Sequence, residues 1–166
     1  MGNILLMKQA HSPDHTDAGA ALTDLMLDIF RANGALLASG DRLVAPLGLT
    51  SARWQVLGSI ALSYSALPVA HLARVMGLSR QAVQRVVNDL EAEGFVAFEP
   101  NPHHKRAHLV VLTAKGQEAY DAATAKEVPW ANALAEGLSA EEIVTARRVV
   151  TQLIRHLENG AEDKGS

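Results

Sequence analysis

One predicted helix, residues 80–93, carries a polar stripe whose side chains are of the types that read DNA bases. The stripe residues recur three or four positions apart, which places them on one helical face: Gln81, Gln84, Arg85 and Asn88. Arginine pairs with guanine, and glutamine or asparagine with adenine, through two hydrogen bonds each. Ser79 and Arg80 stand at the beginning of this helix and complete its predicted DNA contacts.

The other side of the same helix is apolar and is predicted to point inward. It is formed by Val83, Val86, Val87 and Leu90. The acids Asp89, Glu91 and Glu93 gather at the C-terminal end, where the helix dipole disfavours them. A helix selected for stability alone would not have this order, so the pattern favours a DNA-recognition helix.

A basic turn follows the helix. Two segments of strand-forming residues, 95–98 and 108–112, flank the turn 100–106, which is rich in Pro, His and basic residues. This pattern predicts a β-hairpin with a positive tip, a wing, in which Lys105 and Arg106 contact DNA.

The recognition helix needs a partner helix to hold it. Pro68 suits the first turn of a helix that carries Leu72, and Gly77 supplies the left-handed residue that ends it. Ser79 is a strong N-cap for the next helix. The two helices form a helix-turn-helix, and Leu78 is predicted to pin its corner.

The charge distribution agrees with binding to phosphate. The chain has 166 residues and a net charge of −3. Residues 42–117 hold 8 basic and 4 acidic residues, whereas the flanks hold 7 basic and 14 acidic residues. Phosphate responds to the local electric field, so the positive charge of residues 42–117 matters more for DNA binding than the negative net charge of the whole chain. Scattered arginines that merely solvate the surface are the alternative interpretation.

The outer segments are predicted to be helical. A helix from Asp17 ends near residues 46–48, and a second begins after its N-cap Thr50. Thr113 caps a helix that extends to about Glu136. Ser139 and Glu142 form a capping box for the last helix, whose inward residues are predicted to be Ile143, Val150, Leu153, Ile154 and Leu157.

Several function classes lack support. The chain has no Cys, which excludes disulfides, thiolate catalysis and Cys-based zinc sites. No nucleophile, zincin, P-loop or dinucleotide-binding motif occurs, so we expect no enzyme, no catalytic residue and no cofactor. His103, His104 and His108 lack settled metal-ligand spacing and are better interpreted as weakly cationic wing side chains near DNA phosphates. His71 is expected to be structural. No apolar run is long enough for a membrane helix, and we expect a cytoplasmic protein.

The order of helix, helix, helix-turn-helix, wing, helix and helix resembles the MarR family of bacterial transcriptional regulators. Residues 45–50 followed by Trp54 look like the family's passage into its second helix. Residues 78–96 look like its recognition helix and the segment that follows this helix, and residues 106–116 look like the end of its wing. The similarity covers most of residues 20–155.

The resemblance implies a mainly α fold with a small β-hairpin, divided into a winged helix-turn-helix lobe and terminal dimerisation helices. We expect the lobe to comprise residues 49–112 and the dimerisation helices to comprise 17–48 and 113–158. Residues 1–16 have no sustained apolar period and residues 159–166 are polar, so these segments are expected to be a flexible arm and tail. The family pattern also implies an obligate homodimer on a near-palindromic DNA operator, with a recognition helix in each major groove and Arg106 in the minor groove. The terminal helices independently carry more apolar residues than the small winged core of one subunit can cover.

Two positions depart from the family pattern. The Asp that often steadies the wing two residues before the minor-groove Arg is replaced by His104. The first wing strand ends in Phe98 and Glu99 where arginines are usual, so it contributes little to phosphate binding.

The family's effectors, often phenolic or aromatic acids, bind near the second helix, where Arg53 is suited to a carboxylate and Trp54 to an apolar wall. Trp54 is as readily a core anchor.

The leading hypothesis is a repressor that such an effector releases from DNA. The alternatives are a winged-helix module that binds a protein partner, and a DNA-architectural protein without an effector.

Overall fold

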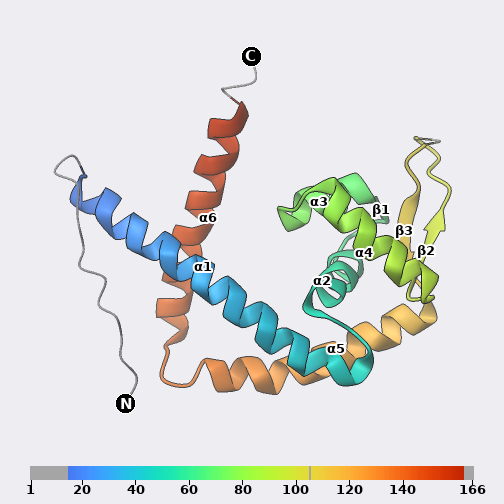
Figure 1. Cartoon of the computed structure of the whole chain (residues 1–166), viewed down its shortest axis with the longest axis horizontal. Helices are drawn as coiled ribbons and strands as arrows, with labels where there is room; N and C mark the ends of the chain where they lie inside the picture. Colours follow the sequence, from blue (N-terminus) through green and yellow to red (C-terminus); the bar gives the residue numbers. More distant parts are fainter. Residues whose placement is uncertain (1–14, 105, 163–166) are drawn as a thin grey trace. The chain divides into compact units, whose positions relative to one another are not determined.

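The computed structural model describes residues 15–104 and 106–162, and within these residues the chain divides into two compact units between Ala123 and Thr124. The first unit contains α1 (Asp17–Val44), α2 (Ser51–Ala61), α3 (Val69–Met76), α4 (Arg80–Ala92), three short strands and the beginning of α5 (Ala114–Leu134) (Figure 1). The second unit contains the rest of α5 and α6 (Ala140–Glu162). Among the described residues, no helix combines the length and apolarity needed to cross a membrane.

The entry into the winged lobe is fixed by buried polar contacts between α1 and α2. After α1, a 3-10 turn leads to Gly48, whose φ of 72° is left-handed. Thr50 then caps α2 by accepting a hydrogen bond from the Arg53 N–H at 3.3 Å, as predicted. Ser51 is 5% exposed, and its hydroxyl donates to the Leu37 carbonyl at 2.8 Å. Because these buried groups are paired, α2 begins at a fixed position on α1.

The wing belongs to a three-stranded antiparallel sheet in the order β1-β3-β2. The hairpin of β2 (Val96–Glu99) and β3 (Leu109–Leu112) was predicted, with bounds one residue off at the beginning of each strand and at the end of β2. The third strand, β1 (Leu67–Pro68), was missed, because two residues that include a proline carry no strand pattern. Pro68 pairs with Leu109 and also stands at the N-cap of α3, so it ends the strand and begins the helix.

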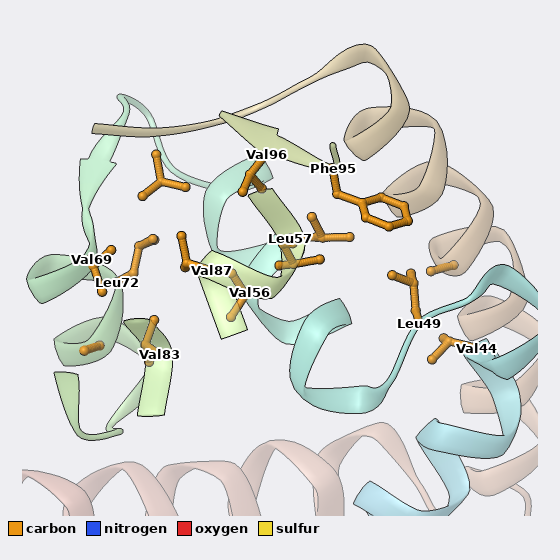
Figure 2. Close-up of a cluster of buried hydrophobic side chains, with 14 residues drawn as sticks. Val44, Leu49, Val56, Leu57, Val69, Leu72, Val83, Val87, Phe95 and Val96 are labelled. Carbon is orange, nitrogen blue, oxygen red and sulfur yellow. The ribbon is translucent and has the colours of Figure 1, made fainter. Parts of the chain in front are cut away.

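One apolar core fills the winged lobe and extends to Val44 at the end of α1 and Ala123 of α5 (Figure 2). Leu57 of α2, Leu72 of α3 and Leu90 of α4 have no exposed side-chain surface. Val110 of β3 is equally buried, so the sheet closes the core that the helices form. The inward positions predicted for α4 are confirmed, with Val83, Val87 and Leu90 fully buried and Val86 partly buried.

The second unit differs from the prediction at its end. The predicted capping box is present, since the Ser139 N–H donates to Glu142 Oε2 at 2.8 Å and the Glu142 N–H to Ser139 Oγ at 3.2 Å. The tail predicted from residue 159 is wrong by four residues, because α6 continues to Glu162. Residues 163–166 of the predicted tail and residues 1–14 of the predicted arm lie outside the described residues. Gly160 does not take the left-handed conformation that ends helices, and a helix tolerates a glycine there at a cost of about 1 kcal/mol.

Three of the five predicted inward residues of α6 are exposed in the single chain, and the other two, Val150 and Leu153, are half-buried. Ile143 is 44% exposed, Ile154 49% and Leu157 65%. α1 shows the same feature, with Phe30 at 73% and Leu36 at 51%. Apolar faces of this size are usually covered by another surface.

Candidate nucleic-acid interface

The helix-turn-helix is held by its backbone and its caps. Gly77 ends α3 with a φ of 64°, and Ser79 caps α4 by accepting a hydrogen bond from the Ala82 N–H at 3.2 Å. The prediction that Leu78 pins the corner is wrong, since its side chain is 49% exposed. The Leu78 N–H instead donates to the Ala73 carbonyl at 2.9 Å, so a Schellman-type backbone turn fixes the angle without a buried side chain.

The outer face of α4 is polar and open. Gln81, Arg85 and Asn88 are exposed, as are Ser79 and Arg80 at the beginning of the helix. Gln84 is half-buried, and its amide donates to Asn88 Oδ1 at 2.8 Å, which orients both side chains on the surface. A hollow of about 620 Å³ follows this face and is lined by Arg80, Gln81, Gln84, Arg85, Asn88 and Asp89. The predicted stripe therefore forms one continuous surface.

The C-terminal end of α4 is anchored by Glu93. Its carboxylate forms a two-armed ion pair with the Arg53 guanidinium of α2, with Arg53 Nη1 3.0 Å from Glu93 Oε2. Lys115 Nζ donates to the Glu93 carbonyl at 2.7 Å and lies 4.2 Å from the centre of the Phe95 ring. The hydrogen bond from Arg53 holds the pKa of Glu93 below its ordinary value. The acid at this end of α4 thus has a stabilising partner, which the sequence pattern did not indicate.

The wing turn is closed by Asn101. Its side-chain oxygen accepts a hydrogen bond from the His103 N–H at 2.9 Å, and its amide donates to the Ala107 carbonyl at 3.0 Å. Because Asn101 spans the turn with these two hydrogen bonds, its side chain holds the wing turn closed. Arg106 is exposed next to this clamp, whereas Lys105 lies outside the described residues and its contact stays a prediction.

A second hollow of about 490 Å³, which we call the wing cavity, lies between α3, α4 and the wing. Its ionisable lining residues are His71, Arg74, Arg80, His104, Arg106 and His108. Of these residues, the sequence predicted Arg80 and Arg106 as DNA contacts and His104 and His108 as weakly cationic wing side chains, whereas it placed neither His71 nor Arg74 at the interface. The absence of acidic residues around His71 and Arg74 indicated a basic segment. The side of α3 that meets the wing depends on β1, which was not predicted.

The proposed effector residues have structural partners. Arg53 pairs with Glu93 and donates to the Gly48 carbonyl at 3.3 Å. Trp54 is half-buried and packs against the core, which favours the core-anchor interpretation. Neither residue lines the two hollows described above. Among the described residues, no group of three or more His, Asp or Glu side chains is arranged to hold a metal ion.

The chain is similar to known transcriptional regulators. A sequence model of the MarR family matches residues 47–107. The uncharacterized protein Rv2011c of Mycobacterium tuberculosis is 36% identical over 130 residues, which cover 78% of this chain and 90% of that protein.

Two solved structures share the fold. Sco5413, a MarR family transcriptional regulator from Streptomyces coelicolor, is 29% identical with a TM-score of 0.67, over 87% of this chain and 98% of that one. A mutant MarR from Escherichia coli complexed with operator DNA is 24% identical with a TM-score of 0.72, over 83% of this chain and 99% of that one. The chain belongs to the MarR family of DNA-binding, winged helix-turn-helix transcriptional regulators.

Proposed function

We propose that this protein is a dimeric, sequence-specific DNA-binding regulator that places α4 in the major groove and the wing at the minor groove. The observation that carries the proposal is the division of α4 into two faces. Val83, Val87 and Leu90 are buried, whereas Gln81 and Arg85 are exposed on the opposite side. The core therefore holds the helix rigidly while the base-reading side chains remain accessible.

The wing is the second element of the proposed interface. Arg106 is exposed beside the Asn101 clamp, and a long, always charged side chain suits the narrow minor groove. The Escherichia coli MarR bound to operator DNA shares the fold, which supports this docking mode. We propose that Lys105 contacts phosphate nearby.

The partner of each subunit is proposed to be a second copy. The exposed apolar residues of α1 and α6 would be covered in a homodimer, each helix by an element of the other subunit. Two recognition helices related by two-fold symmetry would then meet half-sites about one helical turn apart on a near-palindromic operator.

Repression relieved by a small aromatic or phenolic acid is the finer part of the proposal, and it rests on the family. An effector carboxylate that binds Arg53 would have to displace Glu93 from the guanidinium. Displacement of the Glu93 carboxylate from Arg53 would then loosen the C-terminal end of α4, because this ion pair holds α4 to α2.

The test is a comparison of Arg85→Ala with wild type on a duplex selected for binding. Loss of a two-bond base contact should cost about 1–3 kcal/mol and relax preference at one base pair. Arg42→Ala, which removes an exposed arginine from the last turn of α1, is the matched control. Equal affinity of wild type and Arg85→Ala at every salt concentration would contradict the proposal. The absence of any discrete, salt-sensitive complex would favour a module that binds a protein partner.

A further inference from the structure

Two side chains of the polar stripe on α4, Gln84 and Asn88, are bonded to each other. The Gln84 amide donates to Asn88 Oδ1, with 2.8 Å between Nε2 and Oδ1. The residues are four positions apart, the spacing at which amide side chains meet on a helical surface. Both line the wing cavity and also the hollow along the outer face of α4. This bonded pair, which we call the amide pair, therefore stands on the surface that the two hollows share.

The other side chains of the stripe are not held in this way. Among the described residues, neither Gln81 nor Arg85 makes a side-chain hydrogen bond or ion pair, and both are exposed. A free glutamine side chain has several rotatable bonds, so a base contact must first order it at a cost in conformational entropy. Gln84 is half-buried and already bonded, so the folded helix has largely ordered it before DNA binds.

The hydrogen-bonding groups that remain on Gln84 match one base. A carboxamide has one oxygen and two N–H groups. Gln84 gives one N–H to Asn88, so its oxygen and its second N–H remain available. In the major groove, adenine presents N7 as an acceptor and its N6 amino group as a donor. The two remaining groups of Gln84 can therefore pair with both adenine groups at once.

Asn88 is in a different situation, because its oxygen is already directed along the helix to Gln84. Pairing with adenine needs the amide oxygen and an N–H to face the base together. Asn88 could present that edge only by breaking its bond to Gln84, which would release the Gln84 side chain. Asn88 is therefore better suited to hold Gln84 than to read adenine itself.

We propose that Gln84 reads an adenine in each half-site of the operator through two hydrogen bonds, and that Asn88 is the positioning residue that orients the Gln84 amide for this contact. This inference rests on the proposed function, because the adenine belongs to the duplex that α4 reads. The bond to Asn88 takes the N–H that points away from Gln84 Oε1. The edge that carries Oε1 and the other N–H then faces the base.

The two residues should differ in the size of their effects. Gln84→Ala should lower affinity about five- to 150-fold per half-site and abolish the preference for adenine at one position. Gln84→Glu keeps the size of the side chain but offers acceptors only, so it should lose the same preference. Asn88→Ala should lower affinity about two- to tenfold per half-site, because Gln84 must then be ordered on binding.

Two further variants separate positioning from direct contact. Asn88→Asp keeps an acceptor for the Gln84 amide, so it should retain the ratio of affinities for adenine over other bases although its charge weakens every complex. In a chain that already carries Gln84→Ala, Asn88→Ala should have no further effect on adenine preference, because Asn88 acts through Gln84.

The experiment measures the Kd of the full chain by fluorescence anisotropy on selected duplexes that carry each possible base pair at the test position. Two more duplexes carry 7-deazaadenine, which lacks the N7 acceptor, or purine, which lacks the N6 amino group. Wild type should bind both less tightly than adenine, whereas Gln84→Ala should bind all three alike. Gln117→Ala is the matched control, because Gln117 donates to Asp121 Oδ1 on α5 at the same spacing and the same 2.8 Å. Circular dichroism checks the fold of each variant.

The outcomes separate this inference from the proposed function. If Arg85→Ala changes base preference but Gln84→Ala changes no preference for adenine, the inference is overturned while the proposed function stands. Loss of a guanine or thymine preference in Gln84→Ala would mean that Gln84 offers only donors, which also overturns it. An effect of Asn88→Ala that is equally large with and without Gln84 overturns the positioning role. Absence of a discrete wild-type complex on every duplex overturns the proposed function itself.

Discussion

Replacement of Asn101 by alanine should weaken DNA binding without unfolding the lobe. The side chain closes the wing through two hydrogen bonds, one from the His103 N–H at 2.9 Å and one to the Ala107 carbonyl at 3.0 Å. Each is worth about 1 kcal/mol net, so the ordered turn loses about 1–2 kcal/mol. If Arg106 must be ordered to enter the minor groove, this loss reappears in binding, and Kd rises about five- to thirtyfold.

The assay joins a binding measurement to a local structural one. Fluorescence anisotropy gives Kd on a selected duplex, and hydrogen exchange follows the Ala107 amide, which donates to the His104 carbonyl. Gln55→Ala, which removes an exposed amide from α2, should change neither. Faster Ala107 exchange with an unchanged Kd would refute the role of the wing in binding. Unchanged exchange would refute the role of Asn101 in the wing.

Two further predictions concern stability. Gly116→Ala should lower the urea midpoint by the equivalent of about 2–3 kcal/mol, because a β-carbon there would overlap the Phe95 carbonyl oxygen and lie 2.9 Å from its carbon. At Gly34→Ala the new β-carbon would meet no described atom within 4 Å apart from its own chain neighbours and the nearby backbone of α1, and a gain of up to about 1 kcal/mol is expected. An equal loss in both variants would count against the close approach at Gly116. Glu93→Gln should lower the free energy of unfolding at neutral pH, by an amount that shrinks as the pH falls below about 4.5. The pKa of Glu93 is lower in the folded chain than in the unfolded chain, so its ionised carboxylate stabilises the fold at a pH above the unfolded pKa. This stabilisation is lost as the pH falls through the folded pKa and the carboxylate is protonated. Urea midpoints of this variant, wild type and Glu91→Gln between neutral pH and about pH 3 measure it, and a difference independent of pH would refute the ion pair's contribution.

The recognition helix was predictable from local chemistry. The signals that define it each act within a few residues, so they can be recognised in the sequence alone. They are the N-cap Ser79, the left-handed Gly77 and the valines at helical spacing. The exposed stripe follows, because burying one face of α4 leaves the other outside. The capping box of Ser139 and Glu142 was predictable for the same reason.

The features that sequence reasoning missed depend on residues far apart in the chain. Arg53 and Glu93 are forty positions apart, and neither has a local signal that names its partner. β1 has two residues and exists only because β3 offers a free edge. The position of Leu78 was predicted wrongly because an apolar residue at a turn was taken to be buried, whereas the backbone alone closes that turn.

Selection of bound duplexes from a random library by the full chain is the decisive test of DNA reading by α4. If two copies each present the exposed face of α4, the enriched sequences will contain inverted half-sites with centres about 10 base pairs apart, and Arg85→Ala will lose preference at one position in each half. Enrichment of no motif, or of a single half-site without its inverted partner, would contradict a symmetric, base-reading dimer.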